Sequence, residues 1–268
     1  MTTVRDIEKM LFAWAPRDLA ADWDNVGHLV GAGGSAVHRV LVSLDITEPV
    51  VEEAVTMGAD LIVSHHPIMN CTWHKVQHVT DEDAQGRMVM KLLRHGISAI
   101  CMHTNLDAAE GGVNDVLATA LGLSGISPLN DEKNGRIGTT KCEIPLVEFT
   151  SFVLKSLRCN GLRYTDSGRP VHRVAVGGGA CGEYIENAMA LGCDTFVTSD
   201  LKYHEFLDHG AINLIDAGHF PTENLICPEI VSRLQGAFPD GKRGLRAPCR
   251  AAARRVPVRP RDPVVGPP

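Results

Sequence analysis

The chain lacks the features that would direct it to a membrane or out of the cell. None of its 268 residues belongs to an apolar stretch near the roughly 18 residues that a membrane helix needs. The first residues do not join a basic segment to an apolar run, so we expect no secretory signal. The eight cysteines include no C-x-x-C pair, and most stand among apolar residues. We therefore expect a cytoplasmic protein with reduced, mostly buried thiols and no membrane contact.

A basic surface is also missing from most of the chain. The formal net charge is -6, yet residues 241–268 hold eight Lys or Arg and one Asp, which leaves -13 on residues 1–240. Phosphate neutralisation requires clustered cations, so the acidic body argues against a nucleic-acid-binding protein. The segment 241–268 is rich in Arg, Pro, Ala and Gly, which predicts a disordered basic tail. Such a tail could touch nucleic acid or acidic lipid, but solvated disorder is the favoured interpretation.

The chain does contain an internal repeat. Residues 39–66 align with residues 173–200 at a constant offset of 134 and without a gap. Each copy predicts a strand, a helix that stops at a glycine (Gly58 or Gly192) and a second strand. Two βαβ units can resemble one another by chance, but the ungapped register favours a duplication. The identical pairs are Arg39/Arg173, Val40/Val174, Val42/Val176, Glu52/Glu186, Ala54/Ala188, Gly58/Gly192, Asp60/Asp194 and Val63/Val197.

Predicted strands and helices alternate along the whole body. This alternation predicts an α/β fold with mainly parallel sheets flanked by helices. With the duplication, it predicts two related lobes, residues 1–125 and 126–240, followed by the tail 241–268. The junction is expected within residues 124–145, where Gly, Asn, Asp and Pro are frequent.

The first copy ends in two adjacent imidazoles. His65 and His66 close the apolar run 59–64, and Pro67 follows. Imidazole is the commonest metal ligand among side chains, and sites in α/β sheets gather at the carboxyl ends of strands. The second copy has Ser199 and Asp200 at these positions, so the scaffold repeats while the ligand pair does not. An isolated His–His pair could also be a hydrogen-bonded loop.

Two further clusters follow predicted strands. The first holds His103 and Asp107, although Asp107 could instead cap the helix that begins near Val113. The second holds His219 and Glu223, four residues apart, although Glu223 could simply favour the positive end of a helix. Together the three clusters supply histidines and carboxylates without cysteine. That donor set is typical of a two-metal hydrolytic centre, which we expect between the lobes.

Four sequence blocks resemble the NGG-one-interacting-factor-three-like family, whose bacterial members are often labelled GTP cyclohydrolase 1 type 2 homologs. The resemblance spans roughly residues 4–240 and implies a two-lobed α/β fold, a dinuclear metal centre and a ring-like homohexamer built as a trimer of dimers. The spacer between the lobes is too short for the inserted domain of long members. The blocks are VSHHPIM (63–69), MHTNLD (102–107), VTSDLKYHE (197–205) and DAGHFPTE (216–223).

The resemblance also implies roles for individual residues. His103, Tyr203 and His204 would lie near the site, and His103 or His204 would act as the catalytic proton shuttle. Lys202 could offset a substrate phosphate. Two divalent ions per subunit, Zn, Fe or Mn, would be bound. Their implied ligands are His65, His66, Asp107, His219 and Glu223.

The predicted activity is metal-dependent hydrolysis of a small molecule, a nucleotide or related heterocycle, with GTP ring opening as the version that the family suggests. GTP itself has little support, because the chain has no G-x-x-x-x-G-K-S/T loop. The run 177–179 of three glycines could receive phosphate on its amides, but such a run more often marks a tight turn. The alternatives are a phosphoesterase and a non-enzymatic, metal-binding hexamer that interacts with partners.

The C-terminus departs from the family pattern. After residues 237–240, family members continue with a final strand and an acidic end, whereas this chain becomes rich in Arg, Pro and Ala. The abrupt change is typical of an altered reading frame, although natural divergence would give the same sequence.

Overall fold

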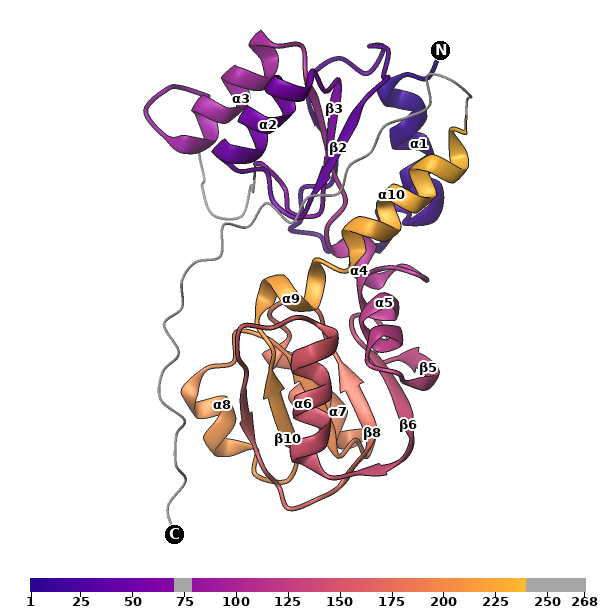
Figure 1. The fold of residues 1–268 in the computed structure, drawn as a ribbon, viewed down its shortest axis with the longest axis vertical. Helices are drawn as coiled ribbons and strands as arrows, with labels where there is room; N and C mark the ends of the chain where they lie inside the picture. Colours follow the sequence, from indigo (N-terminus) through magenta and orange to yellow (C-terminus); the bar gives the residue numbers. More distant parts are fainter. Residues whose placement is uncertain (70–78, 240–268) are drawn as a thin grey trace.

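The computed structural model describes residues 1–69 and 79–239 as two sheets with helices packed against them (Figure 1). The predicted tail, 241–268, lies outside the described residues. In the described part, every helix is too short or too polar to cross a bilayer.

The first lobe has a four-stranded sheet in the order β1-β4-β3-β2. β2, β3 and β4 run parallel, and β1 pairs antiparallel with β4. All residues of these three parallel strands are buried, as expected when helices cover both faces of a sheet. The elements are α1 (Val4–Trp14), η1 (Arg17–Leu19), β1 (Gly27–Val30), β2 (Val40–Ser43), α2 (Glu48–Met57), β3 (Leu61–Ser64), α3 (Ala84–Arg94), β4 (Ser98–Cys101) and α4 (Thr104–Ala108).

The second lobe has a six-stranded sheet in the order β5-β6-β8-β9-β10-β7. Only β8, β9 and β10 are parallel, and the other three strands pair antiparallel. The α/β fold with two flanked sheets is confirmed, but this sheet is mixed where a mainly parallel one was expected. The elements are α5 (Val113–Ala120), β5 (Ser124–Pro128), β6 (Arg136–Ile144), α6 (Leu146–Ser156), β7 (Arg163–Thr165), β8 (Val171–Val176), η2 (Gly182–Tyr184), α7 (Ile185–Ala190), β9 (Thr195–Thr198), α8 (Tyr203–Asp208), β10 (Asn213–Asp216), α9 (His219–Glu223) and α10 (Ile226–Ala237).

The two copies of the repeat fold alike. β9 begins and ends 134 residues after β3. A glycine with positive φ follows each helix, Gly58 (62°) directly after α2 and Gly192 (74°) after α7 and its cap Leu191. The carboxylate of Asp60 accepts hydrogen bonds from the amides of residues 38 and 39 at 2.8 and 2.9 Å. Asp194 accepts from the amides of residues 172 and 173 in the same way, at 3.0 and 2.7 Å. The shared hydrogen bonds explain why this aspartate is identical in both copies.

Two helices pack across the junction. α5 contributes Val113 to the core of the first lobe and Leu117 and Ala118 to the core of the second sheet. α10 returns to the first lobe, where Ile230 and Leu234 join the core formed by α1 and the first sheet (Figure 1). The chain therefore ties both lobes together at its middle and at the end of its described part.

The apolar stripe of Ile226, Ile230 and Leu234 predicts one continuous helix over residues 221–234, but the structure has two helices, α9 and α10. Pro228 has no N–H, so it is tolerated only in the first turn of a helix. A helix that contains Pro228 therefore has to start close before it, and α10 begins at Ile226. The break leaves Glu223 as the last residue of the short α9.

Shortening a buried side chain of α10 should destabilise the fold. Ile230 is fully buried, so Ile230→Ala should cost about 2–5 kcal/mol of unfolding free energy through lost burial and a cavity. Urea denaturation measures the change. The matched control is Val147→Ala on α6, which should change stability by less than about 0.5 kcal/mol because Val147 is 63% exposed. Equal stabilities of the two variants would contradict the packing role of α10.

Candidate metal centre

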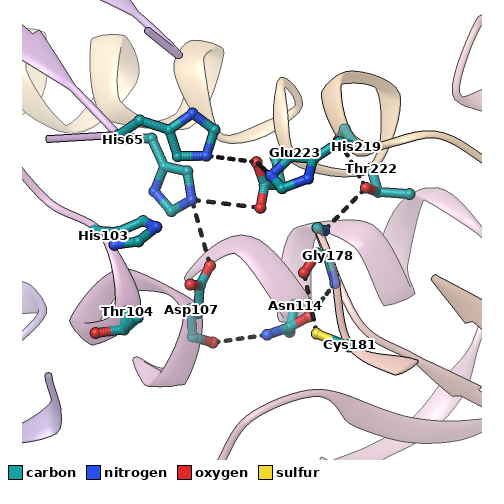
Figure 2. Close-up of polar contacts among 12 residues, drawn as sticks. His65, His103, Thr104, Asp107, Asn114, Gly178, Cys181, His219, Thr222 and Glu223 are labelled. Atoms are coloured by element: carbon teal, nitrogen blue, oxygen red, sulfur yellow. Dashed lines mark hydrogen bonds and ion pairs between the residues drawn. The ribbon is translucent and has the colours of Figure 1, made fainter. Parts of the chain in front are cut away.

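The three predicted ligand clusters meet at the junction of the lobes (Figure 2). His65 and His66 directly follow β3, and His103 lies between β4 and α4. Asp107 stands on α4. His219 and Glu223 form the two ends of α9, after β10. Each side chain therefore follows the carboxyl end of a strand, as the sequence predicted.

Glu223 is the point at which these side chains converge. Its Oε2 lies 3.0 Å from Nε2 of His66 and 3.0 Å from Nε2 of His219. Nε2 of His65 lies 3.8 Å from the other oxygen of Glu223 and 3.5 Å from Oδ1 of Asp107. The structure thus brings together all five residues that the resemblance named as ligands.

His103 joins them as a sixth side chain. Its ring centroid lies 5.2 Å from that of His65 and 5.4 Å from that of His66. Three sets of residues place one ligand atom each within 4.8 Å of the others: His65, His66 and His103; His66, His219 and Glu223; and His65, Asp107 and Glu223.

Each imidazole of the cluster has an oxygen partner on its Nδ1. Such a partner fixes the orientation and the tautomer of a metal-binding histidine, and it leaves Nε2 for the ion. The four pairs are His65 with the carbonyl of Met102 at 2.8 Å, His66 with Asp45 at 2.7 Å, His103 with Asp24 at 2.9 Å, and His219 with Asp200 at 2.6 Å.

Three polar atoms that face the centre make ion-pair contacts with one another or with a neighbouring ring, but no hydrogen bond of regular geometry. They are Nε2 of His65, Oδ1 of Asp107 and Oε2 of Glu223, and all three atoms are buried. A buried polar atom without a partner costs about 1–3 kcal/mol, and more when it is charged. A divalent cation would satisfy all three atoms, and nitrogen and carboxylate donors suit Zn, Fe or Mn. The residues therefore fit a bound metal ion.

The glycines of the 177–179 run make room for the centre. A Cβ on Gly179 would lie 2.2 Å from Oε1 of Glu223 and 3.2 Å from Nε2 of His219, and Gly179 has a φ of 68°. The amide of Gly179 donates to Oγ1 of Thr222 at 3.1 Å, and the amide of Gly178 donates to the Asn114 side chain at 2.8 Å. Both amides therefore donate to side chains of the protein. The absence of a side chain at Gly179 lets the backbone of the run lie close to α9.

Asn114 links the ligands of both lobes (Figure 2). While its oxygen accepts from Gly178, its Nδ2 donates to the carbonyl of Asp107 at 3.0 Å. Asn114 is 1% exposed. One buried amide therefore holds the Asp107 segment against the glycine run beneath Glu223.

The charges of the centre are strongly coupled. Burial alone would raise the pKa of Glu223, but the imidazoles of His219, His65 and His66 that face its oxygens hold the pKa well below its usual range. Burial would lower the pKa of His66 and of His219, but their carboxylate partners outweigh burial and raise the values to about 10 and about 9. Burial raises the pKa of Asp107. Without metal, imidazolium protons balance the buried carboxylate.

His204 and its neighbours lie apart from this cluster. His204 is exposed on α8, and its ring lies 5.3 Å from that of Tyr203. Lys202 is also exposed. Among the described residues, His204 has no hydrogen bond or ion pair to a cluster residue. Its role as a proton shuttle stays a prediction.

The sequence analysis missed the residues that orient the imidazoles. Asp24, Asp45 and Asp200 are single polar residues in loops that only the folded chain brings to the rings, and Asn114 on α5 reaches the backbone of Asp107 in the same way. A signal existed for Asp200, because it stands in the second copy where the first has His66.

The family model described as Duf34/NIF3 (NGG1p interacting factor 3) matches residues 2–248. The chain belongs to the Duf34/NIF3 family. A relative from Clostridium acetobutylicum named GTP cyclohydrolase 1 type 2 homolog is 31% identical over 255 residues, which cover 91% of this chain and 93% of the relative. A relative of the same name from Streptomyces coelicolor is 35% identical over 237 residues, which cover 83% and 82%. The resemblance of the four sequence blocks is thus confirmed.

Solved structures of related proteins share the fold of this Duf34/NIF3 chain. Staphylococcus aureus protein SA1388 superposes with a TM-score of 0.86 and 26% identity, covering 95% of this chain and 98% of that chain. A Bacillus cereus protein related to NIF3 gives a TM-score of 0.85 at 23% identity, covering 93% and 97%.

Metal binding to this Duf34/NIF3 protein should release protons. A histidine binds a metal ion only as the neutral imidazole. The pKa values of about 10 and about 9 keep His66 and His219 protonated at pH 7.5. We expect about two protons released per site, measured by titration calorimetry in buffers of different ionisation enthalpy.

The raised pKa values stabilise the metal-free fold below about pH 6.5, and this stabilisation is lost as pH rises through about 9–10. The zinc-induced rise in melting temperature should therefore grow from pH 6 to pH 9, and a rise independent of pH would refute this.

Gly179→Ala should remove metal without unfolding the chain. The new Cβ would collide with the Glu223 carboxylate. The control is Gly192→Ala, where φ is 74° and nothing lies within 4 Å. Both variants should lose roughly 1–2 kcal/mol from the left-handed backbone. Only Gly179→Ala should lose bound metal by elemental analysis, and a normal metal content in this variant would contradict the described fit.

Proposed function

We propose that the chain is a dinuclear-metal-dependent hydrolase of a nucleotide or related heterocycle, similar to GTP cyclohydrolase 1 type 2. The observation that carries this proposal is the sharing of Glu223 by two ligand sets. One set adds His66 and His219, and the other adds His65 and Asp107. A carboxylate between two sets is suited to bridge two ions.

The ligands in this proposal are His65, His66, Asp107, His219 and Glu223. These residues would hold two divalent ions, which would supply a water of lowered pKa and stabilisation of oxyanion charge. The residues of the chain position and orient these groups. The five ligands fix the positions of the charges, and the carboxylates on Nδ1 of His66 and His219 keep those rings from rotating.

His103 is the better placed of the two predicted proton shuttles. Its ring adjoins those of His65 and His66, and Asp24 holds its Nδ1 at 2.9 Å. A carboxylate on one ring nitrogen stabilises the imidazolium that forms when the other nitrogen takes a proton. Burial would raise the pKa of Asp24, but His103 and Thr104 outweigh burial and lower the pKa to about 2, so this carboxylate stays ionised. His103 would therefore carry a proton between the reacting group and solvent.

The relatives named GTP cyclohydrolase 1 type 2 homolog support a nucleotide substrate, with opening of the guanine ring and release of formate as the specific version. We further propose that the protein acts in the cytoplasm as a homohexamer.

His65→Ala should abolish the activity. His65 is fully buried between Asp107 and Glu223, so its loss removes one ligand set. We expect formate release from GTP by the metal-loaded protein to fall at least about 100-fold, consistent with loss of a water of lowered pKa. The matched control is His95→Ala, which removes an exposed imidazole on the first lobe and should leave the rate unchanged.

A panel of nucleotides and simple phosphate esters, assayed for formate and for phosphate, separates the alternatives. Phosphate without formate would replace the proposal by a phosphoesterase. Full metal occupancy with a silent panel would replace it by a non-enzymatic metal-binding protein.

A further inference from the structure

An indole stands beside the cluster on the side of His103. Trp23 is 52% exposed, and its ring forms a T-shaped pair with that of His103, with the centroids 6.1 Å apart and the planes at 75°. His103 in turn adjoins His65 at 5.2 Å. One imidazole therefore separates an exposed aromatic surface from the metal-binding rings.

The segment that carries Trp23 is held in place by its neighbours. The amide of Ala21 donates to Oγ1 of Thr104 at 3.0 Å. The carboxylate of Asp24 accepts from the amide of Thr104 at 3.0 Å and pairs with His103. Asn25 donates to the carbonyl of Met69 at 2.7 Å, in the loop after β3. Residues on both sides of Trp23 are thus fixed to α4 and to the loop of the histidine pair.

A fixed but exposed indole is a prepared binding surface. Ordering a side chain on binding costs about 0.5–1.5 kcal/mol, and a backbone already held in place reduces that cost. The indole face attracts other planar rings through stacking. Asp24, the next residue, pairs with His103 and places an ionised carboxylate beside the indole, which does not favour a free anion there. Ring contact supplies affinity there without requiring charge.

We propose that Trp23 is the stacking platform for the planar heteroaromatic ring of the substrate. The inference rests on the proposed function, because a ring stacked on Trp23 would extend over His103 towards the metal-binding imidazoles. It assigns the substrate class through the ring and leaves the phosphate groups outside the contact.

The test is binding, measured by titration calorimetry on the full-length, metal-loaded protein. The probes are guanosine, adenosine and a pterin, which carry a ring without phosphate, and inorganic triphosphate, which carries phosphate without a ring. Trp23→Ala should weaken binding of at least one ring probe about 5- to 150-fold, the range that base–aromatic stacking gives. Triphosphate binding should change less than about twofold. Trp23→Phe should restore most of the affinity, because it keeps an aromatic face.

Phe152→Ala is the matched control, since Phe152 is an aromatic residue on α6 with 44% exposure. It should bind every probe like the parent. A parent that binds no ring probe would overturn the proposal, as would equal losses for ring and triphosphate probes or a Trp23→Phe variant as weak as Trp23→Ala. Ring binding through Trp23 without turnover would refute the hydrolase and retain the platform. Turnover without ring binding, for example of an aliphatic ester, would refute the platform and retain the hydrolase.

Discussion

The structure depends on one buried negative charge. Glu223 is 3% exposed, at the junction of two sheets, and three imidazoles point at its oxygens. An ionised carboxylate in such a place is stable only when cations surround it. The imidazoles can supply those cations as protons, and metal ions can replace the protons. The same charge therefore explains the raised pKa values of His66 and His219 and makes the centre suited to a metal ion.

The lobes are joined in a way that keeps the ligands in register. Arg136 on β6 is buried, pairs with Asp115 at 2.7 Å and donates to the carbonyls of Ala108 and Ala109 at 3.1 Å. These carbonyls end the helix that carries Asp107, so a residue of the second lobe holds a ligand of the first. With α5 and α10 packed across the junction, the two halves of the centre cannot separate without exposing both cores.

The meeting of the candidate ligands could be predicted from the sequence because each follows an apolar strand within a short block, and their binding of metal stays a prediction. Strand order, by contrast, depends on pairing between distant segments. β7 is three residues long and exposed at two of them, so its periodicity carries no signal, yet it closes the second sheet beside β10. The carboxylates that pair with Nδ1 of the imidazoles could not be predicted from the sequence either. Asp24 precedes β1 by three residues, and its partner His103 is 79 positions away, a contact that composition and local spacing do not encode.

The two copies of the repeat contribute different groups to the candidate metal centre. Position 66 of the first copy is a histidine that points its Nε2 at Glu223, and the matching position of the second copy is Asp200, which has a φ of 56° and accepts from the ring of His219. The copies differ at many positions, but the difference at 65/199 and 66/200 falls at the candidate metal centre. There the first copy presents imidazole nitrogens and the second presents a carboxylate that orients His219, so a repeated frame holds two unlike sets of groups.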